Sequence, residues 1–334
     1  MIKDLLSIVT PCYNGGAFVH KLLDSILMQT YPSIEMFLID DGSIDNTAEV
    51  VQSYIRRFED RGYKLTYIFQ QNGGQSVAIN NGLKLINGEF FVWPDSDDFY
   101  TYSYTLERLI DGLKSSNDET GMIRCRNLIV DEITGQERKT KKNRCVCDYS
   151  NLFEDCLYGA NGFWFLSGGY IVKTEALFDV IPTKSIYTSK NAGQNWQLML
   201  PMLYKYKCIT IEDKLYTVTE RMASHSRGQY STFEQVLSKF EAYEATLLET
   251  ISCMLIPKEK KNTILKSLKD KYTFERMKVC ISHYKQNRYR IFYNEIKNYV
   301  SIVYRAIYFL SYIPYSFILI KLVNRVVLKL KSMF

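Results

Sequence analysis

This 334-residue sequence lacks several features that mark common protein classes. None of its eight cysteines forms a Cys-x-x-Cys pair, so reduced thiols are favoured over disulfides or a zinc site. The Met1 end has no basic, apolar and small-residue signal peptide, which favours a cytoplasmic location. No Gly-x-Gly-x-x-Gly fingerprint follows the first apolar run, and this argues against a dehydrogenase.

Charge is distributed unevenly along the chain. Residues 257–334 contain 17 Lys and Arg but only 4 Asp and Glu, whereas the whole chain has a net charge of +6. The front of the chain is therefore acidic and its end is basic and aromatic, so the two parts are expected to have different partners. With 46% hydrophobic residues, the chain can bury a full core and is neither disordered nor fibrous.

Apolar runs alternate with helical patterns over the first third of the chain. Runs at 5–10, 34–39, 65–69 and 90–93 predict strands, and apolar residues at helical spacing follow the first three. This alternation predicts an α/β fold whose parallel strands are joined by right-handed crossovers. The carboxyl ends of the first, second and fourth strands are then expected to meet at one edge of the sheet.

Acidic residues follow two of these predicted strands. Asp40 and Asp41 close the second run, and Asp95, Asp97 and Asp98 follow the fourth. Such carboxylates repel one another unless a cation is bound, and Mg²⁺ is commonly held by one or two carboxylates together with phosphate oxygens. The pattern therefore indicates a metal–diphosphate site, with a helix-capping Asp as the alternative interpretation.

Several other segments carry weaker signals. The glycine-rich stretch 72–74 suits a phosphate at a helix N-terminus, although alone it favours a turn. The basic run 138–144 is expected to be a solvated hairpin tip rather than a nucleic-acid site. His225 lies in a polar loop, where a lone His is more often a loop residue than a ligand, while the adjacent arginines suit a phosphate. Segments 208–211 and 215–218 predict a short hairpin.

The end of the chain has a different pattern. Helical periodicity predicts two long helices, 233–253 and 258–283. The apolar stretch 302–320 is interrupted by Arg305 and Pro314 and is flanked by lysines and arginines. A segment lying in a membrane interface is the favoured interpretation, with a membrane span and a packed soluble helix or partner surface as the alternatives.

Three motifs resemble, in order and spacing, those of family 2 glycosyltransferases, which have the GT-A fold. They are Ser-Ile-Val-Thr-Pro-Cys-Tyr-Asn at 7–14, Leu-Ile-Asp-Asp-Gly-Ser at 38–43 and Pro-Asp-Ser-Asp-Asp at 94–98. The resemblance covers about residues 3–230. It implies a mostly parallel, Rossmann-like central sheet flanked by helices.

The resemblance also divides the chain. A GT-A domain is expected at 1–230, with a nucleotide-sugar-binding half at 1–100 and an acceptor-binding half at 101–230. A helical, basic and aromatic extension follows at 231–334, and its last part, 297–334, is expected to associate with a membrane interface.

Carried over position by position, the resemblance assigns site residues. It implies a nucleotide-diphospho-sugar donor, usually a UDP-sugar, with Mn²⁺ or Mg²⁺ as the cofactor. The implied nucleotide-sugar contacts are Pro11, Tyr13, Asn14, Asp40, Asp41, Gly74, Asn80, Asp95 and Ser96. The implied acceptor contacts are Trp164, Gln194 and Trp196, and the implied metal ligands are Asp95, Asp97 and His225. The candidate catalytic residues are Asp98, Asn195 and Glu220.

Two positions depart from the family pattern. Ile79 stands where Arg is frequent, which removes a positive side chain from the diphosphate. Gln194 and Asn195 stand where the family has Glu-Asp, whose Asp is the catalytic base. An amide cannot accept a proton at neutral pH, and a missing base typically costs about 10²–10⁴-fold in rate. Either Asp98 or Glu220 is then the base, or Asn195 merely orients the acceptor, or the chain binds without turnover. An ordinary helix start also explains the two amides.

The sequence therefore predicts a hexosyl- or N-acetylhexosaminyl-transferase that is peripheral on the cytoplasmic face of the cell membrane.

 It is expected to move a sugar onto a hydroxyl of a glycan or polyprenyl-linked oligosaccharide in cell-surface polysaccharide synthesis, with inversion, and to bind an anionic membrane surface. No nucleic-acid partner is expected. A catalytically silent nucleotide-sugar-binding subunit and a nucleotidyltransferase are the alternatives.

Overall fold

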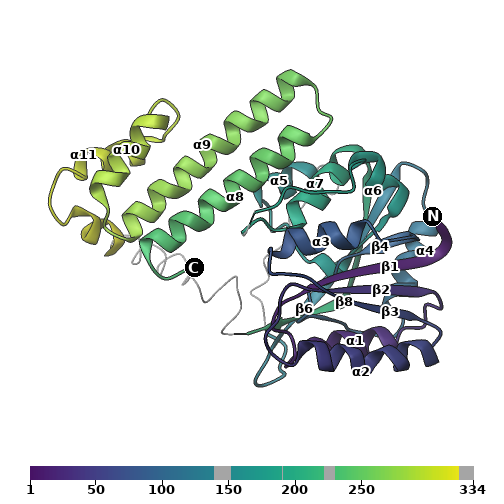
Figure 1. Ribbon diagram of the computed structural model, residues 1–334. Coiled ribbons are helices and arrows are strands. Elements are labelled where there is room, and N and C mark those ends of the chain that lie inside the picture. The colour runs from purple at the N-terminus through teal and green to yellow at the C-terminus, as the bar shows by residue number, and fades with distance from the viewer. Residues whose placement is uncertain (139–151, 190, 222–229, 323–334) are drawn as a thin grey trace. The chain divides into compact units, whose positions relative to one another are not determined.

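The computed structural model describes residues 1–138, 152–189, 191–221 and 230–322 (Figure 1). Its contacts divide the chain into two compact units, Met1–Met222 with Cys253–Leu255 and Ala223–Ser252 with Ile256–Phe334. The first unit combines strands and helices, and the second is helical. The domain boundaries expected from the sequence stay predictions.

Four parallel strands form the first half of the sheet, as the alternation of apolar runs and helical patterns predicts. β1 pairs with β2 and β4, and β2 pairs with β3, all in parallel. Their carboxyl ends therefore lie at one edge of the sheet. The elements of this half are β1 (Ile2–Cys12), α1 (Val19–Leu27), β2 (Ile34–Asp40), α2 (Thr47–Asp60), β3 (Lys64–Phe69), α3 (Gln75–Leu83) and β4 (Gly88–Val92).

The second half of the sheet mixes parallel and antiparallel pairs. β7 runs antiparallel to β4 and β6, β8 runs parallel to β6, and β5 runs antiparallel to β8. Among the described residues, the strand order is β3-β2-β1-β4-β7-β6-β8-β5. The elements are β5 (Phe99–Tyr100), α4 (Thr105–Lys114), β6 (Thr120–Asp131), α5 (Leu152–Tyr158), β7 (Tyr170–Lys173), α6 (Thr174–Val180), α7 (Asn195–Lys205) and β8 (Lys207–Glu220).

The hairpin predicted within 208–218 is wrong, because both of its segments belong to the single strand β8. The register between β6 and β8 shifts at Arg126, opposite a polar stretch of β8 that resembles a turn in the sequence. Glu212 and Asp213 of this stretch are exposed and pair with Arg126 and Arg108. An irregularity of this kind accommodates extra residues without reversing the chain.

Helices cover both faces of the sheet (Figure 1). Side chains of α1, α2 and α4, such as Leu22 and Phe58, share a core with β1, β2 and β4 on one face. On the other face α3 packs closely on β1, since a Cβ at Gly82 would lie 2.2 Å from the Val9 side chain. Burying each large apolar side chain contributes about 1.5–3 kcal/mol. The sheet edge that carries the acidic residues therefore rests on a well-packed core.

The second unit contains the helices α8 (Phe233–Cys253), α9 (Lys258–Ser282), α10 (Gln286–Ile296) and α11 (Ile302–Leu310). The two long helices predicted from the sequence are confirmed as α8 and α9. Side chains such as Tyr289, Tyr293 and Phe317 form the core of this unit. Its helices therefore share an apolar centre of their own.

The apolar stretch 302–320 is not one continuous helix. α11 ends at Leu310, turns follow, and helical structure resumes at Ser316. Pro314 lies in the break, where its missing N–H disfavours a continuing helix. Within the described ranges, no helix combines the length and the apolar character needed to cross a membrane.

Candidate functional site

The carboxylate of Asp41 anchors the glycine-rich loop that precedes α3. It accepts hydrogen bonds from the backbone N–H of Gly73 and of Gly74, both at 2.8 Å, and from the side chain of Gln70 at 2.7 Å. Asp40 is equally occupied, because it accepts from Tyr67 Oη at 2.6 Å and from the N–H of Ser43 at 2.8 Å. Asp40 and Asp41 therefore hold the loops at this edge of the sheet through hydrogen bonds. Their predicted contacts to a nucleotide stay predictions.

Gly42 allows the loop after β2 to approach the glycine-rich loop. Its φ of +81° favours glycine, and a Cβ there would lie 2.8 Å from the backbone nitrogen of Asn72. Gly62 has a similar φ of +79° but open space around it. The two glycines therefore separate backbone strain from the cost of crowding.

Gly42→Ala is expected to lower the free energy of unfolding by about 2 kcal/mol, because it adds a close contact to the strain of a positive φ. Gly62→Ala carries the strain alone and is expected to cost about half as much. Chemical denaturation of both variants measures the difference. Equal losses at the two positions would show that the approach of Asn72 to Gly42 is not tight.

The loop after β1 is tied to the loop after β2. The N–H groups of Asn14 and Gly16 donate to side chains of the second loop, Ser43 Oγ at 2.8 Å and Asp45 Oδ2 at 3.0 Å, and the N–H of Gly15 donates to Thr47 Oγ1, at the start of α2, at 2.8 Å. These bonds fix the edge on which Pro11 and Tyr13 lie. The side chain of Tyr13 is 43% exposed there, so its ring is accessible to a ligand.

Asp95 collects hydrogen bonds from three separate segments. Ser167 Oγ donates to its Oδ2 at 2.8 Å, and the side-chain amides of Gln75 and Gln194 donate to its Oδ1 at 3.2 and 3.3 Å. Burial, followed by the charge of Asp97, raises the pKa of Asp95 to about 6, although the three hydrogen bonds oppose the shift. Gln75 directly follows Gly74, so the acids after β2 and after β4 meet at the same edge, as predicted.

Asp97 forms an ion pair with Arg221, the residue that follows β8. The guanidinium carbon of Arg221 also lies 3.9 Å from the centre of the Phe18 ring, which holds it over the start of α1. Asp98 is buried and accepts from the N–H of Thr219 at 3.0 Å. Burial, together with the charges of Asp97 and Asp95, raises the pKa of Asp98 well above its ordinary value. The positive charge of Arg221 therefore offsets only part of the negative charge of Asp95, Asp97 and Asp98.

This set of residues fits a divalent cation bound together with a diphosphate. Asp95 and Asp97 are partly exposed, and two carboxylates with several phosphate oxygens are a common arrangement for Mg²⁺. In the part of the chain that the structure describes, no three His, Cys, Asp or Glu side chains are grouped as a complete metal site. His225, the third predicted ligand, lies outside the described residues.

Gln194 and Asn195 lie at the start of α7, beside the acids. Asn195 Oδ1 accepts from the buried indole N–H of Trp93 at 3.0 Å. Gln194 is only 1% exposed, and while its amide nitrogen faces Asp95, its Oε1 has no hydrogen-bond partner among the described residues. Trp196 is partly exposed and donates to the Cys156 carbonyl at 3.0 Å. The amides therefore occupy a position from which Gln194 reaches the acid cluster.

Two other predicted site residues have contacts that the sequence did not reveal. The side-chain amide of Asn80 pairs with both backbone groups of Ile186, at 2.8 and 2.9 Å. The carboxylate of Glu220 pairs with Arg138, whereas the next residue, Arg221, reaches Asp97. Glu220 is the last residue of β8 and Arg221 follows the strand, so adjacent residues at the end of β8 have different partners.

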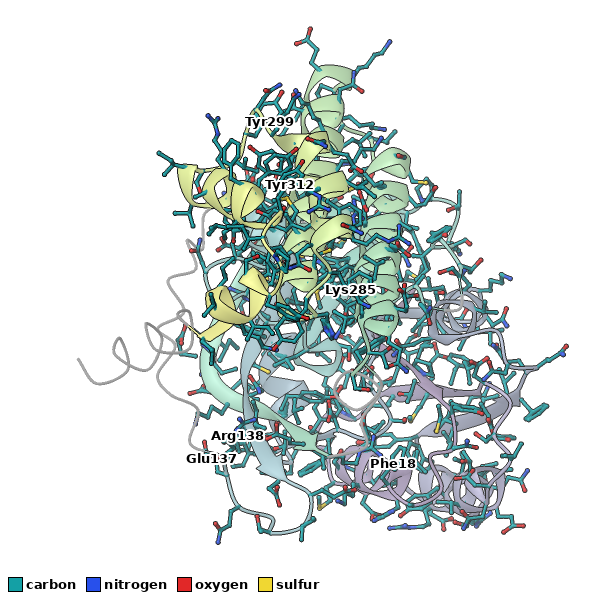
Figure 2. The ribbon with its side chains drawn as sticks, turned by 90° about the vertical axis from the view of Figure 1, so that its left-hand side faces the viewer. Phe18, Glu137, Arg138, Lys285, Tyr299 and Tyr312 are labelled. Atoms are coloured by element: carbon teal, nitrogen blue, oxygen red, sulfur yellow. The ribbon has the colours of Figure 1, made fainter. Side chains whose placement is uncertain are left out.

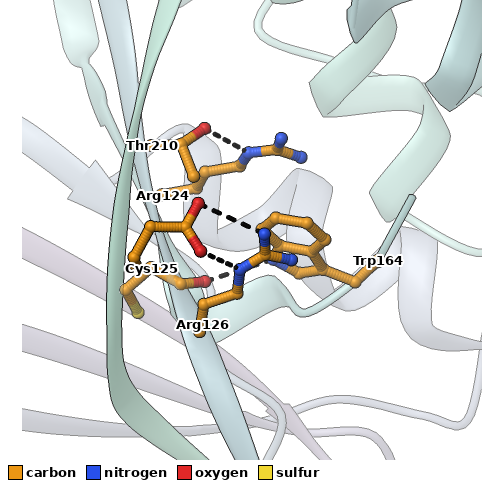
Figure 3. A network of polar contacts seen from close by, with 6 residues as sticks. Arg124, Cys125, Arg126, Trp164 and Thr210 are labelled. Carbon is orange, nitrogen blue, oxygen red and sulfur yellow. Dashed lines mark hydrogen bonds and ion pairs between the residues drawn. The ribbon is translucent and has the colours of Figure 1, made fainter. Parts of the chain in front are cut away.

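Trp164, a predicted acceptor contact, lies against two arginines of β6 (Figure 3). The guanidinium carbons of Arg124 and Arg126 lie 3.8 and 4.2 Å from the centre of its ring, and its indole N–H donates to the Cys125 carbonyl at 3.2 Å. Glu212 pairs with Arg126 at 2.9 Å. These contacts hold the ring in place while leaving it partly exposed.

Asp98→Asn is expected to stabilise the protein in metal-free buffer. Because the folded-state pKa of Asp98 lies above that of an unfolded Asp, the wild type loses stability as the pH rises through the folded-state pKa. Asn keeps an acceptor for Thr219 and carries no charge. A gain of about 1 kcal/mol, or roughly 2–4 °C in Tm, is expected at mildly alkaline pH, with a smaller gain in mild acid. A pH-independent change, or a lower Tm, would contradict charge repulsion between Asp98 and the carboxylates of Asp95 and Asp97. The control is Asp60→Asn, on the exposed face of α2.

Comparisons with known proteins agree with this geometry. Residues 7–161 match the family described as Glycosyl transferase family 2. An uncharacterized glycosyltransferase of Rickettsia typhi is 35% identical over 130 residues, which span 39% of this chain and 38% of that relative. The chain therefore matches less than two-fifths of the length of that relative.

Two solved structures have the same fold. S. aureus TarS 1–349 in complex with UDP-GlcNAc gives a TM-score of 0.62 at 19% identity, covering 87% of this chain and 80% of that one. The mannosyltransferase PcManGT from Pyrobaculum calidifontis, in complex with GDP-Man and Mn²⁺, gives 0.52 at 16% identity, covering 94% and 86%. The predicted GT-A fold is confirmed. Residues 7–161 therefore carry the match to glycosyl transferase family 2, and the chain shares the fold of these two solved structures.

Proposed function

We propose that the chain transfers a sugar from a nucleotide-diphospho-sugar, by preference a UDP-sugar, to a hydroxyl of a glycan or lipid-linked oligosaccharide. The observation that carries this proposal is the gathering of Asp95, Asp97 and Asp98 beside the loop that Asp41 anchors. The solved structures are complexes of TarS with UDP-GlcNAc and of PcManGT with GDP-Man and Mn²⁺, which supports a nucleotide-sugar donor with a divalent cation. A hexosyl or N-acetylhexosaminyl group is the sugar that we assign.

The donor site is built for a leaving diphosphate. Mn²⁺ or Mg²⁺ held by Asp95 and Asp97 would neutralise the charge that develops on the diphosphate as the anomeric C–O bond breaks. Arg221 brings a positive side chain to the same place, although Ile79 stands where the family often has Arg. Pro11 and Tyr13 then contact the nucleotide base at the exposed edge of the β1 loop.

The acceptor hydroxyl attacks the anomeric carbon on the side opposite the leaving diphosphate, so the product has inverted configuration. Its proton must pass to a base, which an amide cannot be. We assign this role to Asp98, because Glu220 pairs with Arg138 and the other two acids serve the cation. Gln194 and Asn195 orient the acceptor, with Trp164 and Trp196 beside them.

A donor screen tests the proposal. The purified full chain is incubated with a panel of UDP- and GDP-sugars, with Mn²⁺ or with a chelator, while thermal shift and nucleotide release are measured together. One donor is expected to raise Tm only with Mn²⁺ and to release the nucleoside diphosphate. Release of pyrophosphate would instead indicate a nucleotidyltransferase, and the absence of any Mn²⁺-dependent donor shift would contradict donor binding.

A second candidate function is that of a catalytically silent nucleotide-sugar-binding subunit. It is favoured by Gln194 and Asn195, the two amides that stand where the family has Glu-Asp. Asn195 Oδ1 already accepts a hydrogen bond from Trp93. This function predicts a Mn²⁺-dependent donor shift without nucleotide release by the wild type. Release that appears only in Asn195→Asp would favour the silent subunit, because Asp can accept the Trp93 hydrogen bond as Asn does and restores a base.

The cellular setting of the proposed reaction is cell-surface polysaccharide synthesis at the inner face of the cell membrane. What supports it is the basic composition beyond residue 256, with 17 Lys and Arg against 4 Asp and Glu. A polyprenyl-linked acceptor would be presented at such a membrane.

A further inference from the structure

The end of the second unit exposes large apolar side chains that its core does not use. In α11 only Ile307 is buried, whereas Ile302 is 82%, Val303 59% and Phe309 71% exposed. Past the end of α11, Tyr312 is 60% and Tyr315 77% exposed. Figure 2 labels Tyr299 and Tyr312 on this part of the second unit. We call residues 299–322 the apolar surface.

Such a surface is unusual for a protein domain that has no partner. Contiguous apolar patches on soluble proteins commonly mark a binding site for protein or membrane. The second unit already has a packed core that contains Tyr289, Tyr293 and Phe317, and α11 contributes Ile307 to it. Among the described residues, Ile302, Val303 and Phe309 are therefore not part of this core.

Charge identifies the partner. Glu295 is the last acidic residue of the chain, and all six charged residues after it are Lys or Arg. Arg305 is exposed within α11, between Val303 and Phe309. Two copies of this surface would bring like charges together, which disfavours self-association. An anionic partner with an apolar interior is complementary to both features.

A lipid bilayer with anionic headgroups has that combination. Tyrosines suit the headgroup level, where an apolar ring meets a polar hydroxyl, and the stems of Lys and Arg extend to phosphate while aliphatic neighbours insert. Basic residues near an anionic bilayer add an electrostatic attraction to the insertion of apolar side chains. The short α11, at nine residues, suits a helix lying in the interface.

We propose that the apolar surface docks on an anionic lipid bilayer, with α11 lying in the membrane interface and Arg305 facing the headgroups. This docking does not depend on the proposed sugar transfer. It requires only the side chains of residues 299–322 and negative lipid headgroups.

Vesicle flotation with the full chain tests the proposal. The chain is expected to float with vesicles of phosphatidylcholine and phosphatidylglycerol and to bind vesicles of phosphatidylcholine alone at least about tenfold less. The double variant Ile302→Ser/Phe309→Ser is expected to bind the anionic vesicles about tenfold or more weakly, because two apolar side chains no longer insert. The matched control is Ile44→Ser/Ile133→Ser in the first unit, where the two side chains are 89% and 83% exposed.

Three outcomes would overturn the proposal: no flotation of the wild type, equal flotation with both kinds of vesicle, or equal losses in the two double variants. A wild-type dimer that the Ile302→Ser/Phe309→Ser change dissociates would assign the surface to a second copy instead. Thermal melting of both double variants confirms that they are folded. Nucleotide release measured without vesicles is expected to be unchanged in the surface variant, so failure of docking and failure of the proposed function are distinguishable.

Discussion

Asp97→Asn is expected to reduce sugar transfer by about 10²–10³-fold, the size of loss seen when one group that stabilises developing charge is removed. The substitution keeps the shape of the side chain and a partner for Arg221 but removes the negative charge that a divalent cation requires. The Mn²⁺-dependent thermal shift is expected to disappear with the activity. Because the charge of Asp97 raises the pKa of Asp95 and Asp98, the fold itself is not expected to be weakened in metal-free buffer.

Asp213→Asn is the matched control for this prediction. Asp213 also pairs with an arginine, Arg108, at 3.0 Å, but both side chains are more than half exposed and neither belongs to the acid cluster. Activity and the Mn²⁺ shift should therefore match the wild type. An Asp97→Asn variant that keeps both the activity and the shift would remove Asp97 from the metal site, whatever the resemblance of the motif.

The first half of the fold was predictable because local patterns and topology agree. Each buried run, such as 34–39, ends at a polar loop, and parallel pairing then brings the loops to one edge. The second half was harder to predict, because β7 and β8 join the sheet through contacts distant in sequence. The polar stretch at Glu212 resembles a turn, but its partner Arg126 lies 86 positions earlier in the chain.

The acids of the site were predictable as a cluster, but their partners were not. Asp95 is held by Gln75, Ser167 and Gln194, none of which carries a local signal of its role. The polar loop after β8 suggested a phosphate contact through its arginines, yet nothing in its sequence pairs Arg221 with Asp97, 124 positions away. Such partners are set by the sheet order rather than by spacing.

Arg221→Ala is expected to lower the free energy of unfolding by about 2–4 kcal/mol in metal-free buffer, because it leaves a partly buried carboxylate without its counter-charge. The side chains of Arg221 and Asp97 are only 19% and 25% exposed, so solvent screens the pair weakly. Arg108→Ala breaks an exposed pair and should cost less than about 1 kcal/mol. Denaturation of the two variants measures the contrast.

Adding Mn²⁺ should then distinguish a structural ion pair from one that competes with the cation. In the wild type, a cation at Asp97 competes with Arg221 for the carboxylate, whereas Arg221→Ala removes this competition. The variant is therefore expected to gain more stability from a given concentration of Mn²⁺ than the wild type. At a hundredfold excess over its own Kd, mass action sets the gain of the variant at about 2.7 kcal/mol. Arg221→Ala/Asp97→Asn should recover most of the lost stability and show no Mn²⁺ gain. If the two substitutions instead have additive effects, or if Mn²⁺ stabilises all variants equally, Arg221 and the cation do not share Asp97.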